Sequence, residues 1–455
     1  MEGEVLFVRG QDKALNVTIL IAVVVVLITL IVYNGREIKP YPGFKLHGRV
    51  SGDFFYTKTK EQYAKYGSDF LKKGYDEAKG RIFQILGGSG PLIILPPSFI
   101  DEIRNDKRMT LSGFLEHVLF SNLKIIRELL LTSRKEFFPD YPGMEPWQGL
   151  RNNIFQDVVR KNLTAAIGPL IPELSTVMAR NVQGFLPQDD KEWTELPILQ
   201  TLVPIVAQLT TKIFTGEPLC NNPEWIDISI KFTIEGSMAS RALRSWPAIL
   251  RPLVYRFIPE MRQIQKTYSR ADKLLQEEVE SRRLAAETTT AEGKPAPHHK
   301  DALSWFSDAA AGRQYSMTQG QLLLSFAAIH TTSTTLYAFL FDLLSTPTLL
   351  PELRDEMAAV LRADGGLTKA SLHKLHLLDS CLKESQRLSP LGSTSLHRRV
   401  DAPVTLSDGS RLPRGAVTAV PSFHMHRGLA FDGRSTSGSG TGGTRVRGGL
   451  WPRAC

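Results

Sequence analysis

The stretch FAAIHTTSTT, residues 326–335, decides the fold. It lies in a proline-free segment from Thr318 to Thr346, which opens with Thr318-x-x-Gln321, a predicted capping box, and ends before Pro347. The segment predicts one long helix with an unusual centre, because Thr, Ser and His form helices poorly and hydroxyls inside a helix bond back to the carbonyl one turn earlier. Taken alone, the segment indicates a core helix whose hydroxyls form hydrogen bonds within the helix.

Composition indicates a large globular protein. The chain has 455 residues, of which 42% are hydrophobic and 22% charged, so it can bury a sizeable core. Its formal charge is +9, but Lys and Arg are dispersed among acids and do not form runs with aromatic residues. This dispersion excludes nucleic acid as the expected partner. A basic surface beside a membrane, or facing an acidic redox partner, fits the charge better.

The three cysteines indicate a reducing compartment. Cys220, Cys381 and Cys455 are far apart in the sequence, with neither a metal-ligand spacing nor a disulfide framework. We therefore expect the body of the protein to face the cytosol.

The N-terminal region predicts one membrane crossing. Residues 14–33 form an apolar segment that spans about 30 Å as a helix, and no cleavage pattern follows it. Positive charge is in excess after this segment, which predicts a lumenal N-terminus at residues 1–13 and a cytosolic body. Residues 34–45 contain KPYPG, a predicted Pro/Gly hinge between the anchor and a domain at residues 46–428.

The domain itself is predicted to be mainly α with a small β region. Apolar residues recur at helical spacing through most of residues 60–284, and residues 287–300 resemble a mobile loop. A helix around Leu375 to Leu388 places Glu384 and Arg387 on one face, where an ordinary exposed ion pair is the simplest interpretation. A small hairpin is predicted with arms at residues 404–406 and 416–420.

Together these parts resemble a known family. A membrane anchor, a Pro-Gly hinge, a helical body, an AAIHTT helix and an E-x-x-R helix some fifty residues later are similar to the cytochromes P450, in the membrane-bound fungal style of secondary metabolism. The phrases IFTGEPLC (213–220), DALSW (301–305) and LHRRV (396–400) extend the resemblance. It implies a P450-like helical fold in the endoplasmic reticulum membrane with the globular domain cytosolic, a haem cofactor, and electrons from NADPH-cytochrome P450 reductase. The implied activity is oxidation or hydroxylation of an apolar small molecule such as a terpenoid, an indole-diterpene or a polyketide.

The resemblance assigns roles on the oxygen side of the haem. Ala327 and Ala328 would leave space for dioxygen, and Thr331 would be the proton-relay hydroxyl. His330 stands where the family often has an acid. Its imidazole, with an ordinary pKa of about 6.5, can still pass protons near neutral pH.

The resemblance also assigns roles around the haem edge. Glu384 and Arg387 would hold the loop that frames the haem. Arg399, or with less support its neighbours Arg398 and His397, would face a haem propionate, because guanidinium binds carboxylates in a bidentate manner. Arg160 is the candidate for the other propionate, although Gln156 stands where the family has an aromatic residue.

The end of the chain departs from the family pattern. The expected Phe-x-x-Gly-x-x-x-Cys-x-Gly loop, which carries the thiolate ligand, does not follow Arg427. Residues 429–455 are rich in Gly, Ser and Arg and are predicted to form a disordered tail. Trp451 stands four residues before Cys455 in place of the glycine, so Cys455 is not expected to ligate iron. The fold is therefore expected to be C-terminally incomplete.

Two alternatives stay open at this point. One is a truncated, catalytically dead relic of a P450 that lacks the thiolate ligand. The other is a two-span membrane protein without enzymatic activity, whose second crossing would be Leu322 to Leu344, although His330 and Asp342 make such a crossing costly.

Overall fold

The computed structural model describes residues 25, 40–53, 56–87, 90–111, 113–114, 138, 140–150, 153–187, 194–246, 250–295, 297 and 299–422. The chain divides into two compact units. Unit 1 comprises Met1–Glu136, Leu243–Tyr255 and Ser395–Pro421, and unit 2 comprises Phe137–Ala242, Arg256–Thr394 and Ser422–Cys455. Apart from Val25, the predicted anchor at 14–33 lies outside the described residues, as do positions 34–39 of the hinge and the tail at 429–455.

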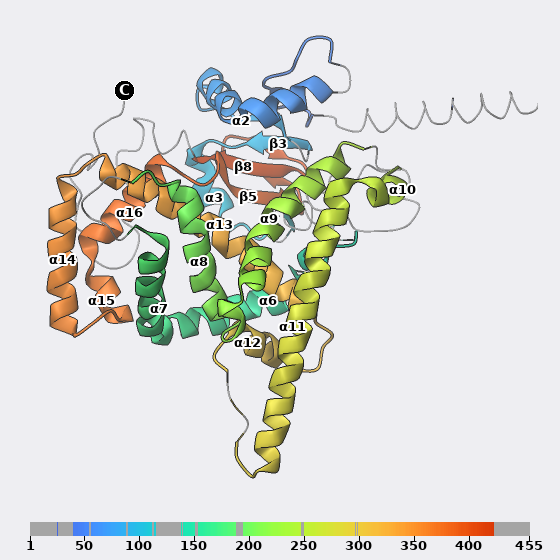
Figure 1. Cartoon of the computed structure of the whole chain (residues 1–455). Coiled ribbons are helices and arrows are strands. Elements are labelled where there is room, and N and C mark those ends of the chain that lie inside the picture. Colours follow the sequence, from blue (N-terminus) through green and yellow to red (C-terminus); the bar gives the residue numbers. More distant parts are fainter. Residues whose placement is uncertain are drawn as a thin grey trace, which may run out of the picture. The chain divides into compact units, whose positions relative to one another are not determined.

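Unit 1 is built on a six-stranded sheet with the order β1-β2-β3-β8-β5-β4. Strand β2 pairs antiparallel with β3, and β4 with β5, whereas β1 with β2 and β3 with β8 are parallel. Figure 1 shows β3, β8 and β5 side by side. The strands are β1 (Lys45–Leu46), β2 (Phe83–Gly87), β3 (Gly90–Ile94), β4 (Met109–Thr110), β5 (Thr394–Val400) and β8 (Val417–Pro421).

Among the described residues of unit 1, one long helix packs on the sheet. Helix α2 (Thr57–Ala78) buries Leu71 against Phe83, Ile85, Ile94 and Ala419 of the strands. These apolar contacts form the core of the unit. The remaining elements are short: η1 (Pro97–Phe99), α3 (Ile100–Ile103), α10 (Arg251–Val254) and the separate hairpin of β6 (Val404–Thr405) and β7 (Arg411–Leu412).

The sheet is larger than predicted, and the predicted hairpin is paired differently. Residues 404–405 pair with 411–412, and residues 417–421 join the main sheet beside β3. The chain turns back before it reaches the predicted second arm. Gly409 adopts a φ of +83° in this turn, and the Ser410 amide donates to Asp408 Oδ1 at 2.8 Å. Strands β2 and β3 could not be predicted, because nearly all of their residues are buried. A short apolar run without polar alternation does not distinguish a strand from a helix.

Unit 2 is helical, so the prediction of a mainly α protein with a small β region is confirmed. Its helices between residues 145 and 257 are η2 (Glu145–Leu150), α6 (Ile154–Asp157), η3 (Val158–Leu163, a π-helical turn), α7 (Thr164–Phe185), α8 (Ile198–Phe214), η4 (Leu219–Asn221), α9 (Pro223–Arg244) and, at the border with unit 1, η6 (Tyr255–Phe257). The later helices are α11 (Pro259–Ala291), α12 (Ala302–Ala310), α13 (Met317–Leu344), α14 (Leu349–Asp364), α15 (Lys369–Lys374) and α16 (His376–Leu388).

Helix α13 corresponds to the long helix predicted from the sequence, but it begins differently. Its N-cap is Ser316, whose side-chain oxygen accepts a hydrogen bond from the Gln319 amide at 3.3 Å. Thr318 instead donates from Oγ1 to Asp272 Oδ1 of α11 at 2.6 Å. The predicted capping box of Thr318 and Gln321 was therefore wrong, because a better cap two residues earlier released Thr318 for a tertiary contact.

Helix α13 is the core helix of unit 2. It packs against α8, η2 and α16, and Ser385 of α16 donates from Oγ to Asp342 Oδ2 at 2.5 Å. Among the described residues it is also the one helix whose length and apolar composition would allow it to cross a membrane. Its Asp342 has a partner inside the unit, and Leu322 and Ile329 are fully buried there. This packing favours a core helix over the alternative of a second crossing.

A buried ion network joins three segments of unit 2 around Arg282 of α11. Its Nε donates to Glu278 Oε1 at 2.6 Å, its Nη1 lies 2.8 Å from Asp301 Oδ2, and its Nη2 donates to the Thr215 carbonyl at 2.8 Å. The exposed fractions of the Arg282, Glu278 and Asp301 side chains are 14%, 9% and 5%. Asp301 also caps α12 by accepting from the Ser304 amide. The network links the phrases at 213–220 and 301–305, because Thr215 and Asp301 belong to them.

The C-terminal end of α11 extends further than predicted. The helix continues to Ala291, so the first residues of the predicted loop at 287–300 are helical. Thr288, Thr289 and Thr290 each donate a side-chain hydrogen bond to the carbonyl four residues earlier. These bonds satisfy the hydroxyls within the helix. Figure 1 shows this end of α11 projecting beyond the other helices of unit 2.

In unit 1, His397 of β5 stacks on a neighbouring aromatic ring. The imidazole and the Phe114 ring have centroids 4.8 Å apart and planes inclined by 19°. Burial lowers the pKa of His397, and the nearby Arg398 charge lowers it further. The ring is therefore neutral at physiological pH.

Replacing Arg282 by methionine should destabilise the protein strongly. The substitution leaves the buried carboxylates of Glu278 and Asp301 without their counter-ion, and breaking a buried pair in this way costs about 3 to 5 kcal/mol. Urea unfolding followed by circular dichroism measures the change.

The matched control is Arg283→Met, one residue further along α11. Arg283 also forms ion pairs, with Glu280 and Glu287, but its side chain is 54% exposed. We expect the control to change the free energy of unfolding far less than Arg282→Met does, because solvent screens exposed ion pairs. Equal effects of the two substitutions would contradict the importance of the buried network.

The lowered pKa of His397 predicts a pH-dependent contribution to stability. Because the folded state binds the proton less readily than the unfolded chain, stability falls as the pH drops below about 6.5, the ordinary histidine pKa. His397→Phe keeps the stacking on Phe114 but removes the titrating group. Its free energy of unfolding should fall less between about pH 7.5 and about pH 5 than that of the unmodified protein.

Chemical denaturation at the two pH values measures this difference. The exposed His373 provides the control, since His373→Phe should follow the unmodified protein at both pH values. Parallel losses for His397→Phe and the unmodified protein would exclude His397 as the source.

Candidate functional site

One face of α13 is open. Ala327, Thr331, Thr334 and Phe341 recur at helical spacing and are exposed. The opposite face is buried, with Ile329 and Ser333 fully so. The open face is formed by small and hydroxyl-bearing side chains in its N-terminal half and becomes apolar at Phe341, which is 52% exposed. It could therefore receive a flat apolar group and a small polar molecule together.

The hydroxyls of Thr331, Ser333 and Thr335 bond back to the helix, as predicted. Thr331 Oγ1 donates to the Ala327 carbonyl at 2.6 Å, with a weaker contact of 3.3 Å to the Ala328 carbonyl. Ser333 donates to the Ile329 carbonyl at 2.7 Å. Since the Thr331 hydrogen is directed at the helix, its oxygen lone pairs face the open side and can accept a hydrogen bond there. Donation to a bound molecule requires the hydroxyl to rotate.

His330 belongs to a different face of α13. Its Nε2 lies 2.9 Å from the Ile230 carbonyl oxygen of α9. A carbonyl oxygen can only accept, so Nε2 carries the hydrogen. Nδ1 has no hydrogen-bond partner among the described residues. The imidazole therefore ties α9 to α13 through Nε2.

Aromatic rings extend the contact between α13 and α9 at Phe326, one helical turn before His330. Phe326 meets the Trp147 ring edge-on at a centroid distance of 5.6 Å, and Trp147 stacks on Phe232 of α9 at 5.4 Å. The side chains of Phe326 and His330 thus dock α13 on η2 and α9. This docking could not be predicted, because Trp147 and Phe232 lie far from α13 in the chain.

Glu384 and Arg387 are brought together on α16. Arg387 Nη2 lies 2.7 Å from Glu384 Oε1, and Arg387 Nε lies 2.8 Å from Oε2. The hydrogen bond to Glu384 raises the pKa of Arg387. The Arg387 side chain is 35% exposed and the Glu384 side chain 19%. This bidentate pair is therefore partly buried and differs from the exposed ion pair that is the simplest interpretation of the sequence. The adjacent Ser385 bonds to Asp342 and fixes the pair relative to α13.

Arg399 lies on β5 in unit 1, whereas Thr331 belongs to unit 2. The Nε of Arg399 is buried and has no hydrogen-bond partner among the described residues. Arg398 differs, because its Nη1 donates to the His397 carbonyl at 2.9 Å, and strand alternation points it to the other face of the sheet. The unsatisfied donor of Arg399 fits a carboxylate acceptor such as a haem propionate. Arg160 is exposed in the π-helical turn of unit 2.

The described cysteines do not fit the role of a haem ligand. Burial, followed by the charge of Glu217, raises the pKa of Cys220 to about 11. Burial also raises the pKa of Cys381, with a further contribution from Glu356. Both thiols are buried, and Cys381 is packed in an apolar cluster with Phe339, Leu343 and Leu353, so both have structural positions. Cys455 lies outside the described residues, and no group of three or more His, Cys, Asp or Glu forms a metal site within them.

Several positioning residues were missed from the sequence. In the sequence, Asp342 is used only as an argument against a second membrane crossing. An acid within an apolar helix also indicates that its carboxylate has a hydrogen-bond partner in another segment. That partner is Ser385. Arg282 gave no signal, because a single arginine in a charged helix resembles any surface residue.

Comparison with known proteins shows the family to which the chain belongs. The family model for cytochrome P450 matches residues 65–431. The chain is 35% identical over 375 residues to cytochrome P450 monooxygenase pyr3 of Aspergillus fumigatus, covering 82% of this chain and 68% of that protein. It is 33% identical over 430 residues to cytochrome P450 monooxygenase bsc2 of Alternaria brassicicola, covering 94% and 78%. For cytochrome P450 monooxygenase ntnM of a Nectria species the identity is 34% over 368 residues, covering 80% and 65%.

A solved structure shows the same fold. Retinoic acid bound cyanobacterial CYP120A1 is 16% identical, with a TM-score of 0.50, covering 85% of this chain and 78% of that one. The chain spans about two thirds of the length of several curated relatives, 68% and 65% for the Aspergillus and Nectria proteins. Because the family model matches most of the chain, and fungal relatives are about one third identical to it over the aligned regions, this chain belongs to the cytochrome P450 family.

Proposed function

We propose that this protein is a haem monooxygenase that oxidises or hydroxylates an apolar small molecule in a fungal biosynthetic pathway. The open face of α13, where Ala327 and Thr331 are exposed beside buried neighbours, is the observation that carries this proposal. Relatives named as cytochrome P450 monooxygenases support the reaction class. Haem, when bound, supplies the oxygen chemistry, and the chain supplies the surroundings.

Each residue of the site has a proposed task. Ala327 and Ala328 leave room for a small molecule above the helix. Thr331 accepts a hydrogen bond there and, after rotating, passes a proton on. His330 can exchange protons through Nδ1 while Nε2 stays on the Ile230 carbonyl. Arg399 binds a propionate through its unsatisfied Nε.

Two further tasks concern the frame of the site. The Glu384–Arg387 pair holds the chain that follows α16. Arg160, exposed on η3, is the candidate for the second propionate.

Substrate, electron source and location complete the proposal. A terpenoid, an indole-diterpene or a polyketide would suit an apolar pocket. Electrons would come from NADPH-cytochrome P450 reductase docked on a basic surface. The apolar segment at 14–33 would anchor the protein in the endoplasmic reticulum membrane, with the globular body in the cytosol.

A second candidate is a catalytically silent member of the family. The observation that favours it is that Cys220 and Cys381 are both buried thiols with raised pKa values. Cys381 is packed among apolar residues of α13 and α14, and Cys220 is 4% exposed, so neither is assigned as the thiolate that the reaction needs. No step of the reaction is assigned to a described cysteine.

The reduced carbon-monoxide difference spectrum of the purified full chain, supplied with haem, separates the two candidates. A thiolate-type Soret band supports the monooxygenase, and a spectrum without that band supports the silent protein. We expect Cys220→Ser and Cys381→Ser to leave the spectrum unchanged, because both thiols are structural. A band that disappears in either variant would contradict this assignment, whereas loss only in Cys455→Ser would identify the terminal cysteine as the ligand.

Replacing Thr331 by alanine should uncouple oxygen consumption from product formation. We expect the yield of product per NADPH to fall by about tenfold, because the positioned proton donor is lost while the helix is preserved. Thr332→Ala is the matched control, since Thr332 is also exposed but lies on a different face. Thr331→Ser should retain coupling. Unchanged coupling in Thr331→Ala would remove Thr331 from the relay.

A further inference from the structure

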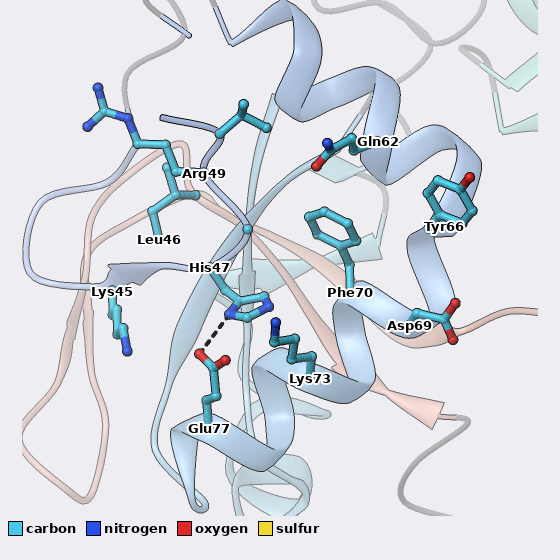
Figure 2. A pocket seen from close by; sticks show the side chains of 12 residues that line it. Lys45, Leu46, His47, Arg49, Gln62, Tyr66, Asp69, Phe70, Lys73 and Glu77 are labelled. Atoms are coloured by element: carbon cyan, nitrogen blue, oxygen red, sulfur yellow. Dashed lines mark ion pairs between the residues drawn. The ribbon is translucent and has the colours of Figure 1, made fainter. Parts of the chain in front are cut away.

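Glu145 is a buried acid that has no task in the site described above. It is the first residue of η2, and its Oε2 is buried without a hydrogen-bond partner among the described residues. The amides of Gly143 and of Glu145 itself donate to the carboxyl group, but no cation pairs with it within the described part of the chain. Glu77 of unit 1 shows the usual arrangement, since its Oε2 lies 3.2 Å from His47 Nδ1 and its side chain is 43% exposed (Figure 2). Glu145 lacks such a partner.

Two side chains of α11, Asp272 and Tyr268, face Glu145. Burial raises the pKa of Glu145, and the charge of Asp272 raises it further. Burial also raises the pKa of Tyr268, so its phenol stays neutral and adds no charge. Asp272 has a partner of its own, because it accepts a hydrogen bond from Thr318 at 2.6 Å. Glu145 is therefore the acid of this group that has to bear its charge alone.

The elements around η2 add no compensating cation. Helix α13 has no charged or titratable side chain from Met317 to Ile329. In α6, Asp157 lies 3.4 Å from Lys161 Nζ, and both side chains reach solvent. The basic residues of α11 from Arg262 to Lys273 are all exposed. A charge on Glu145 would therefore be buried without a counter-ion, which costs free energy.

The segment that carries Glu145 touches α11 and α13 directly. Gly143 has a φ of +86° and lies so close to α11 that a Cβ there would be 2.7 Å from the backbone of that helix. Trp147, two residues after Glu145, is buried and meets the Phe326 ring of α13 edge-on at a centroid distance of 5.6 Å. Because both side chains belong to one short helix, a movement of Glu145 away from α11 also moves Trp147.

We propose that Glu145 is a proton-controlled latch: its uncharged carboxyl group holds η2 on α11, and loss of the proton loosens η2 together with Trp147. A neutral carboxyl group tolerates burial, whereas the carboxylate is drawn toward water and is repelled by Asp272. Trp147 contacts Phe326, the residue before Ala327, so the latch acts at the edge of the open face of α13. It depends neither on haem nor on the proposed monooxygenase activity.

The effect of pH on the latch has a definite sign. The docked carboxyl group binds its proton more readily than the same group in water, so its contribution to docking is complete below about pH 4.3, the ordinary glutamate pKa. This contribution is lost as the pH rises above that value and through the raised pKa of the docked state. His397 acts in the opposite direction, since its contribution is lost as the pH falls.

Hydrogen exchange of the full chain in a non-ionic detergent, at about pH 5 and about pH 7.5, tests the latch without haem. The measured quantity is the protection factor of the η2 amides, which corrects for the intrinsic effect of pH on exchange. In the unmodified protein we expect this factor to be at least about threefold lower at the higher pH. Glu145→Gln keeps the shape of the side chain but cannot ionise. Its η2 amides should be equally protected at both pH values.

Glu277→Gln is the matched control, because Glu277 of α11 is a glutamate whose side chain is 61% exposed. It should follow the unmodified protein. Asp272→Asn should reduce the pH effect, because it removes the repelling charge while its amide oxygen can still accept from Thr318.

Three outcomes would overturn the latch. The first is an unmodified protein whose η2 amides are equally protected at both pH values, and the second is a pH effect that persists in Glu145→Gln or keeps its full size in Asp272→Asn. The third is an equal pH effect on the amides of α16, because it would indicate unfolding of the whole unit and not loosening of η2.

Discussion

The structure of unit 2 depends on one helix that is held on one side and open on the other. Helix α13 buries Ile329 and Ser333, whereas Ala327 and Thr331 are exposed. A run of hydroxyls at such a position would destabilise a core helix if the groups were left without partners. Back-bonding to carbonyls one turn earlier removes this cost, because Thr331 and Ser333 satisfy themselves within the helix. The same chemistry that makes the helix stable also leaves oxygen lone pairs on its open face.

Charged and aromatic contacts between distant segments fix the position of this helix. Ser385 holds Asp342 from α16, and His330 holds the Ile230 carbonyl of α9. Further away, Arg282 joins the end of α8 to the beginning of α12 through buried ions. These contacts are few, but each pairs polar groups that lie far apart in the sequence. For this reason the arrangement of the helices is specific and not merely compact.

The elements with strong local signals could be predicted from the sequence. The long helix at 318–346, the helix carrying Glu384 and Arg387, and the mainly α class all followed from periodicity and breakers. The six-stranded sheet could not be predicted, because β2 and β3 are short buried runs and β1 and β4 have only two residues each. The cap of α13 was misassigned because two hydroxyl residues compete for that role, and only the tertiary contact of Thr318 with Asp272 decides between them. Within the site, spacing predicted the Glu384–Arg387 pair, but the contact of His330 with α9 joins residues one hundred positions apart.

The projecting end of α11 has a practical consequence. Its last turns satisfy their own threonine hydroxyls, and most of its side chains beyond Leu284 are exposed. Few tertiary contacts would be lost if this end were lengthened, shortened or interrupted, since stability is lost chiefly where buried groups are disturbed. Gly293, at a φ of +76° with open space around it, marks the point where the chain leaves the helix. This is the place in unit 2 where an affinity tag or a fluorescent domain can be inserted with least effect on the fold.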